Sequence, residues 1–138
     1  MKIEETKSLV KQVVENYFKY LKEGNTTEII KLYAENAEVI PHGSPSYGGK
    51  NNIEQSYERG FKSIKLHGDV SFKSVDIFDD VTIVRCEEPA QIESLKNETI
   101  VNAYFRELFV LVKNMNTGNW EIFKYMFSQN PNQVKNND

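Results

Sequence analysis

The segment that most constrains the fold is residues 99–128, whose alternating side chains predict two long strands joined by a turn at 114–119. Successive side chains of a strand point to opposite faces of the sheet. One face of the first strand would carry Val101, Ala103, Phe105, Glu107, Phe109 and Leu111. The other face would carry Ile100, Asn102, Tyr104, Arg106, Leu108, Val110 and Val112. The returning strand would place Trp120, Ile122, Lys124 and Met126 opposite Phe123, Tyr125 and Phe127.

Both faces of this hairpin are largely apolar, so both must be covered. We expect helices from elsewhere in the chain to cover one face. A second copy of the chain would cover the other face, because a contiguous apolar patch of that size is rare on a monomer. The sequence therefore predicts a homodimer that forms through the outer face of the sheet. It leaves open which strand face lines a pocket.

The composition excludes several classes of protein. A chain of 138 residues is long enough for one domain with a hydrophobic core. Its formal net charge of −3 does not indicate the positively charged surface that binds nucleic acid. No apolar run approaches the length of a transmembrane helix, and the charged N-terminus lacks the pattern of a signal peptide, so we expect a cytoplasmic protein without membrane contact. The single Cys86 and two separated histidines predict no metal site, and no motif indicates a cofactor.

Three helices are expected before the long strands. Apolar residues at helical spacing predict the first, namely Leu9, Val10, Val13, Val14, Tyr17, Phe18 and Leu21. Gly24 lies where a C-terminal cap is expected. Asn25 and Glu28 then resemble the capping box of a short second helix that runs through Tyr33. A third helix is expected from Asn51 or Asn52 to Ile64, burying Ile53, Tyr57, Phe61 and Ile64.

The strands are expected at residues 37–40, 67–78, 81–93, 99–113 and 119–128. Short turns make the last four antiparallel neighbours. Pro89 cannot donate a ladder hydrogen bond, which predicts a bulge or an open edge at that point. Together these elements predict one α+β domain over residues 1–129, followed by a polar, disordered tail at 130–138.

The order of these elements resembles one known superfamily. The stretch VVENYFKYLKEGNTTEIIKLYAENAEVIPHGSPSYGGKNNIEQSY resembles the opening half of NTF2-like proteins, in particular the SnoaL-like and ketosteroid-isomerase-like branch. Its features are a helix, a glycine turn, a short helix ending Leu-Tyr-Ala-x-x-Ala, a strand, a Pro/Gly-rich loop ending Gly-Lys, and a further helix. The stretch GNWEIFKYMFSQNP resembles the closing strand, which opens on Gly-x-Trp. The resemblance implies a cone of the cystatin-like α+β type, with three N-terminal helices packed on a curved antiparallel sheet around a pocket.

The resemblance also implies one catalytic position and the loss of another. Tyr17 lies seven residues before Gly24, where ketosteroid isomerases carry a tyrosine of the oxyanion hole. A phenol there can donate to a carbonyl oxygen that gains charge, although a tyrosine in a helix can also simply fill the core. The position of the catalytic base falls on Pro41, which has no side-chain acceptor. The second, protonated aspartic acid of ketosteroid isomerases is also missing as such, because no aspartate occurs from Val81 to Val134. Glu107 could substitute only if its side chain points into the pocket. We therefore expect no isomerisation of Δ5-3-ketosteroids.

His42 could replace the missing base, because imidazole titrates near neutral pH, or it could be an exposed loop residue. Arg85 and Arg106 lie within apolar strands, so each either points to solvent or lines the pocket and meets an anionic ligand. The full set of predicted site residues comprises Tyr17 and His42 as catalytic candidates, and Tyr17, Tyr47, Tyr57, Phe61, Arg85, Tyr104 and Arg106 as ligand-binding candidates.

Two functions remain open at this stage. In the first, the protein binds a small, partly apolar, anionic or carbonyl-bearing molecule in its cone and carries out proton transfer without a cofactor. In the second, the protein is a non-catalytic association module whose sheet face serves assembly. A cavity of several hundred cubic ångströms with Tyr17 and an arginine converging inside it favours the first, and a cavity filled by Phe and Leu side chains favours the second.

Overall fold

The predicted hairpin forms the centre of the sheet. In the computed structural model, which describes residues 2–131, strands β6 (Ile100–Lys113) and β7 (Trp120–Gln129) are antiparallel neighbours. The side-chain oxygen of Asn114 accepts hydrogen bonds from the backbone N–H groups of Asn116 and Thr117, which closes the turn. The hairpin prediction is confirmed.

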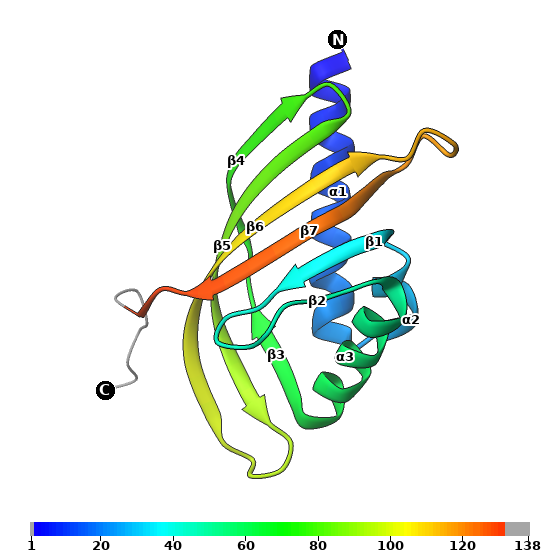
Figure 1. Ribbon diagram of the computed structural model, residues 1–138. Helices are drawn as coiled ribbons and strands as arrows, with labels where there is room; N and C mark the ends of the chain where they lie inside the picture. Colours follow the sequence, from blue (N-terminus) through cyan, green and yellow to red (C-terminus); the bar gives the residue numbers. More distant parts are fainter. Residues whose placement is uncertain (1, 132–138) are drawn as a thin grey trace.

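The remaining elements are α1 (Lys2–Glu23), α2 (Thr26–Ile30), β1 (Tyr33–Ile40), β2 (Tyr47–Gly48), α3 (Lys50–Ser63), β3 (Ile64–Gly68), β4 (Ser71–Phe78) and β5 (Val81–Ser94). The strands of the described region form one sheet in the order β2-β1-β7-β6-β5-β3, and β4 also pairs with β5. The helices lie on one side of this curved, open sheet (Figure 1). This confirms the predicted α+β class. The sheet is mixed rather than wholly antiparallel, because β1 is parallel to β7.

The first helix ends where predicted, and its predicted stripe packs against the core except for Leu9, which is 52% exposed. Val10, Val14 and Tyr17 are fully buried against the rest of the core. Gly24 follows the helix at φ +65°, a conformation that favours glycine. The next helix, α2, is a single turn, whereas the capping pattern predicted helix through Tyr33. That prediction is wrong at its end, because Tyr33 instead begins β1 and pairs with β7.

The strand predicted at 67–78 is divided in two, and the division creates a gap beside β5. Strand β4 pairs with β5 as far as Glu87, and β3 pairs with it from Ala90 onward. Glu88 and Pro89 therefore have no ladder partner on that side of β5, while β6 continues unbroken on the other side. The open edge predicted from Pro89 is thus present inside the sheet, where one neighbouring strand gives way to the next.

A bulge in β7 changes which of its side chains face the helices. The pairing with β6 shifts register around Phe123, so that Ile122 and Tyr125 are both buried on the inner face. Strict alternation placed Trp120 and Ile122 opposite Tyr125, and the bulge corrects that prediction. Tyr125 now stacks on Phe109 with ring centroids 4.4 Å apart.

Two sequence predictions lie partly or wholly beyond what the structure tests. Most of the tail predicted at 130–138 lies outside the described residues, and the single-domain boundary at 129 stays a prediction. Among residues 2–131, no helix combines the length and apolar character that a membrane span requires.

Candidate functional site

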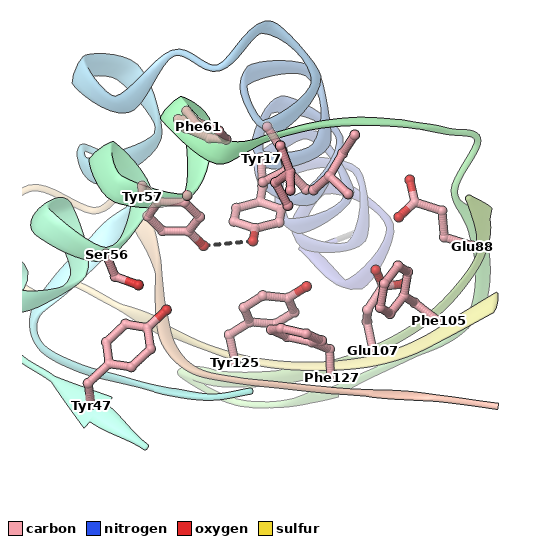
Figure 2. Close-up of a pocket in the computed structure, with 14 residues that line it drawn as sticks. Tyr17, Tyr47, Ser56, Tyr57, Phe61, Glu88, Phe105, Glu107, Tyr125 and Phe127 are labelled. Atoms are coloured by element: carbon pink, nitrogen blue, oxygen red, sulfur yellow. Dashed lines mark hydrogen bonds between the residues drawn. The ribbon is translucent and has the colours of Figure 1, made fainter. Parts of the chain in front are cut away.

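A cavity of about 150 Å³ lies between the inner face of the sheet and helices α1 and α3. It is lined by Tyr17, Leu21, Tyr47, Ser56, Tyr57, Gly60, Phe61, Ile64, Leu66, Glu88, Phe105, Glu107, Tyr125 and Phe127. The lining contains aromatic rings, aliphatic side chains, hydroxyl groups and two carboxyl groups, and it contains no basic side chain. Figure 2 shows the hydroxyls of Tyr47, Ser56 and Tyr57 toward one end and the carboxyls of Glu88 and Glu107 toward the other.

Three tyrosines from three elements share hydrogen bonds at one end of this cavity. The hydroxyl of Tyr57, on α3, lies 2.7 Å from the hydroxyl of Tyr17 on α1 and 2.6 Å from that of Tyr33 on β1. Tyr17 is 1% exposed, and its ring also packs against Tyr125. Burial raises the pKa of all three phenols above their ordinary value, so each remains a neutral donor at neutral pH.

Two glutamates from adjacent strands occupy the other end. Glu88 on β5 and Glu107 on β6 project from the same face of the sheet, offset diagonally across the ladder. They are 7% and 3% exposed, respectively. The two carboxyl groups lie within hydrogen-bonding reach of each other, which requires one of them to carry a proton.

The surroundings of the two carboxyl groups give them unequal acidity. Burial, followed by the charge of Glu88 and the hydrogen bond with it, raises the pKa of Glu107 to about 9. Burial also raises the pKa of Glu88, but the positive charge of Lys22 opposes this and leaves the value at about 7. At neutral pH, Glu107 is therefore protonated and Glu88 is partly ionised.

The gap between β3 and β4 gives the Glu88 carboxyl its room. A Cβ atom built on Gly68, at the end of β3, would lie 2.9 Å from Glu88 Oε2 and 2.9 Å from the carbonyl oxygen of Pro89. Real Cβ contacts are not that short. The absence of a side chain at Gly68 thus allows the carboxyl to lie against the backbone.

Tyr125 connects the two ends of the cavity. Its ring packs against Tyr17 with ring centroids 5.1 Å apart, and burial, followed by the charge of Glu107, raises the pKa of its phenol. The phenols and the carboxyl pair therefore form one continuous polar side of an otherwise apolar cavity. Such a set can donate to a ligand oxygen and accept a proton from a ligand carbon at the same time.

The structure brings together only some of the predicted site residues. Tyr17, Tyr47, Tyr57 and Phe61 all line the cavity, while their roles in binding or catalysis stay predictions. His42 is exposed on the loop after β1, where its Nδ1 accepts a hydrogen bond from the backbone N–H of Gln129. It does not line the cavity, so it is not placed to serve as the base.

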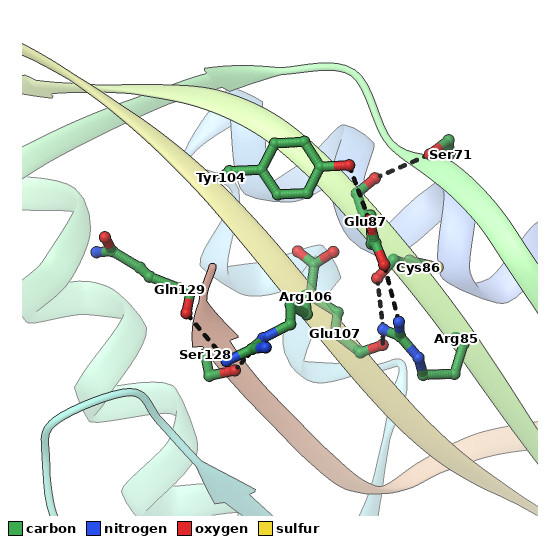
Figure 3. Close-up of polar contacts among 9 residues, drawn as sticks. All are labelled: Ser71, Arg85, Cys86, Glu87, Tyr104, Arg106, Glu107, Ser128 and Gln129. Carbon is green, nitrogen blue, oxygen red and sulfur yellow. Dashed lines mark hydrogen bonds and ion pairs between the residues drawn. The ribbon is translucent and has the colours of Figure 1, made fainter. Parts of the chain in front are cut away.

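The placement of Arg85, Tyr104 and Arg106 in the pocket has to be corrected. Alternation along β5 and β6 turns these side chains to the outer face of the sheet, opposite the inward Cys86 and Glu107. Their partners also lie there (Figure 3). Arg85 donates to the carboxylate of Glu87 at 2.9 Å, and Tyr104 donates to the other oxygen of the same carboxylate at 2.8 Å.

The guanidinium group of Arg106 makes its hydrogen bonds on the same outer face of the sheet. Its Nε donates to the hydroxyl of Ser128 at 3.0 Å, and its Nη2 donates to the backbone carbonyl of Gln129 at 3.2 Å. With both guanidinium groups outside, no arginine lines the cavity to attract an anion.

Sequence reasoning missed Glu88 altogether and treated Glu107 only as a conditional substitute. A signal for both was present in the pattern of the strands. Glu107 shares its face with Phe105 and Phe109, and Glu88 shares its face with Val84 and Cys86. A carboxyl group at an apolar position is the feature to search for, because a buried charge is retained only where it is paired or functional.

Comparison with known proteins gives structural neighbours only. No family model and no curated protein matches the sequence. Among solved structures, a ketosteroid isomerase-like protein from Erwinia carotovora atroseptica superposes with a TM-score of 0.84 at 20% identity, covering 88% of this chain and 94% of that one. The chain has the NTF2-like, cystatin-like fold. The fold implied by the sequence resemblance is confirmed.

Two further neighbours show how widely this NTF2-like fold is used. A candidate dehydratase of the NTF2-like family from Streptomyces avermitilis superposes with a TM-score of 0.79 at 13% identity, covering 89% of this chain and 95% of that one. A candidate calcium/calmodulin-dependent protein kinase II association domain from Xanthomonas campestris gives 0.69 at 21% identity, with coverage of 88% and 86%. At these identities the likeness establishes the fold, and function must be argued from the site itself.

Proposed function

We propose that this protein binds a small, partly apolar carbonyl compound in its cone and transfers a proton on it without a cofactor. The observation that carries the proposal is the pair of glutamates of unequal acidity, Glu88 and Glu107, beside buried phenols in one cavity. Pairs of titratable groups whose pKa values are driven apart are typical of acid–base catalysts. The cavity meets the criterion for ligand binding only in part, because Tyr17 lines it but its volume is about 150 Å³ and no arginine lines it.

The ligand class follows from the lining. Of the anionic and carbonyl-bearing ligands expected from the sequence, the carbonyl compound is favoured, because the ionised form of Glu88 repels an anion and no arginine lines the cavity. Sites for drug-sized ligands enclose roughly 300–1,000 Å³. At about 150 Å³ this cavity suits a molecule with a single ring or a short chain.

Each polar group has a defined role in the proposed reaction. The ionised Glu88 takes a proton from the carbon next to the carbonyl group, and the electron pair of that C–H bond moves onto the carbonyl oxygen. Tyr17 and Tyr125 donate hydrogen bonds to this oxygen as it gains charge, while the protonated Glu107 keeps its hydrogen bond with Glu88. Return of the proton from Glu88 to carbon, at the same or a neighbouring position, completes exchange or isomerisation.

Proton exchange into a simple ketone tests this proposal. The methyl protons of acetophenone in D2O, followed by proton NMR at pH 7, should exchange faster with the native protein than with buffer alone. Glu88→Gln should slow the catalysed exchange by about a hundred-fold to ten-thousand-fold, the range expected for loss of a general base. Tyr17→Phe should slow it less, because Tyr125 remains as a donor. A Glu88→Gln variant as active as the native protein would refute the assignment of the base.

Ketosteroids are not expected to be substrates. The cavity of about 150 Å³ is small for four fused rings, and Pro41 stands where the resemblance to ketosteroid isomerases implies the base. We expect no appearance of the ultraviolet absorbance of a conjugated enone when a Δ5-3-ketosteroid is added to the protein.

The proposed assembly is a homodimer through the outer face of the sheet, and association with another protein is the alternative function. Apolar side chains on that face support it: Leu108, Val110 and Val112 on β6 are only partly buried, and Met126 on β7 is 44% exposed. One structural neighbour is described as a candidate association domain. The cytoplasmic location and the absence of nucleic-acid and membrane partners stay predictions.

A further inference from the structure

One oxygen atom in the cavity has no partner. Among the described residues, the buried side-chain polar atoms without a hydrogen bond are Thr82 Oγ1 and Glu107 Oε1. Glu107 is 3% exposed and its side chain lines the cavity. A buried acceptor without a donor lowers stability, so such an atom at a binding site points to a ligand that supplies the donor.

The hydrogen bond between Glu88 and Glu107 leaves Oε1 without a partner, and the other neighbouring side chains do not supply its donor. Arg85 lies on the outer face, and its Nη1 donates to the backbone carbonyl oxygens of Cys86 and Glu107 rather than to the Glu107 carboxyl. Tyr125 lies nearby, but its hydroxyl is in reach of Tyr17. Lys22 pairs with Asp69 at the end of α1.

The position of this oxygen restricts where the ligand donor lies. Tyr125 lies on β7 diagonally across the ladder from Glu107 and packs against Tyr17, with ring centroids 5.1 Å apart. A ligand that fits a cavity of about 150 Å³ and contacts both the phenols and Glu107 therefore carries its two polar groups close together. The remaining walls, formed by Leu21, Phe61, Phe105 and Phe127, are apolar and leave room for a ring or a short chain.

We propose that the ligand is a small ketone or aldehyde that carries a hydroxyl or amino group on the carbon next to its carbonyl group, and that this group donates a hydrogen bond to Glu107 Oε1. The inference rests on the proposed function, because it places the carbonyl oxygen among the phenols. A hydroxyl group and an amino group can each donate the hydrogen bond that Glu107 Oε1 lacks. The neutral hydroxyl and the protonated amine differ in charge, and the experiment separates them.

Three probes of nearly equal shape test this inference by isothermal titration calorimetry at pH 7. Propiophenone ends in a methyl group, 2-hydroxyacetophenone ends in a hydroxyl group, and 2-aminoacetophenone ends in an ammonium group. We expect at least one of the two donors to bind about ten-fold tighter than propiophenone, the gain from one satisfied buried hydrogen bond. A tighter hydroxyl compound identifies a neutral ligand, and a tighter amine identifies a cationic one. Equal binding of all three probes would overturn the inference.

Variants of Glu107 show whether the preference arises at this carboxyl group. Glu107→Met removes the acceptor at similar side-chain length, so the preference over propiophenone should disappear. Glu107→Gln keeps an oxygen acceptor and should retain the preference for the hydroxyl compound. A Glu107→Met protein that folds and still prefers the donor probes would overturn the inference. If Glu107→Met does not fold, loss of the hydroxyl preference in Glu107→Gln would overturn it, and retention would support it.

The binding experiment and the exchange experiment can fail independently. A protein that prefers the donor probes but does not exchange the protons of acetophenone would refute the proposed proton transfer and leave the ligand class intact. A protein that exchanges those protons but binds all three probes equally would refute the ligand class alone.

Discussion

Two glutamates on adjacent strands give the cavity its chemical character. Glu107 is held neutral because burial and a neighbouring carboxyl group both disfavour its charge, while Lys22 keeps Glu88 more acidic. The same side chain type thus serves as a donor in one place and as a base in the other. The folded protein therefore contains two carboxyl groups whose pKa values are raised above the ordinary glutamate value.

This arrangement predicts that stability falls as pH rises. The ordinary pKa of a glutamate is 4.5, and folding raises it to about 7 for Glu88 and to about 9 for Glu107. Between pH 5 and pH 9 the unfolded chain therefore binds fewer protons than the folded protein, so the free energy of unfolding decreases with pH. Urea titrations should show Glu107→Gln gaining stability relative to the native protein by about 2 kcal/mol or more between these limits.

The matched control for this pH series is Glu58→Gln, which changes an exposed residue of α3. Its pH profile should parallel that of the native protein. A native protein that becomes more stable as pH rises from 5 to 9 would contradict the assignment of raised carboxyl pKa values.

Gly68→Ala should disturb Glu88 without removing a carboxyl group. The new methyl group would meet Glu88 Oε2 and the carbonyl oxygen of Pro89, so the unfolding free energy should drop by about 1–3 kcal/mol. The exchange of acetophenone protons should slow by about ten-fold as the base moves. Adding Glu88→Asp, which shortens the side chain, should restore part of the exchange. No change in exchange rate with Gly68→Ala would show that the position of Glu88 is not set by this contact.

The sequence predicts the inward position of the tyrosine side chains better than that of the two glutamate side chains. Tyr17 and Tyr57 fall on helical stripes that are certain to face the sheet, so their inward position is predictable. The strands offer two apolar faces, and only the packing of the helices decides that Glu107 faces inward and Arg106 outward. Period-two alternation separates these neighbours but does not say which of them lines the cavity.

The elements of secondary structure are positioned by short local signals and by breaks in the sheet. Asn25 accepts a hydrogen bond from the backbone N–H of Glu28, as the capping pattern predicted, and this begins α2. The separation of β3 from β4 and the bulge in β7 bring Glu88 and Tyr125 into the cavity. These two breaks depend on the curvature of the whole sheet, which is why the sequence predicted one unbroken strand and strict alternation instead.

Removal of the α2 cap should cost stability without affecting the site. Asn25→Ala leaves the Glu28 N–H without its acceptor and should lower the unfolding free energy by about 1 kcal/mol, measured by urea titration. Asn25→Asp retains a capping oxygen and should cost much less. Equal losses in the two variants would indicate that Asn25 acts through some contact other than the cap.

For the molecule as a whole, the fold is the property that the sequence predicts best. The predicted order of three helices and five strands, which spans most of the chain, sufficed for the NTF2-like fold, because an order of eight elements tolerates errors at single boundaries. The parallel pairing of β1 with β7 was not predicted, since it joins segments far apart in sequence.

The predicted dimer has a direct test. Light scattering should give twice the chain mass of 16.0 kDa for the native protein at micromolar concentration. Met126→Lys places a charge at an exposed position of the outer face, opposite Leu108 in the ladder, so it should yield the single-chain mass without loss of fold. A native protein of single-chain mass would contradict the dimer.

The central claim is that Glu88 and Glu107 share one buried cavity in unequal protonation states. Carbon-13 NMR of the glutamate side-chain carboxyl groups between pH 3 and pH 10 measures this directly, with Glu88→Gln and Glu107→Gln assigning the signals. Our account predicts two carboxyls that titrate above the ordinary glutamate range, one near neutral pH and one above it. Glu88→Gln should lower the apparent pKa of Glu107, because the charge of Glu88 is removed, whereas Glu107→Gln should not lower the apparent pKa of Glu88, because the hydrogen bond with Glu107 lowers that pKa. Two signals that titrate independently near 4.5 would contradict the account.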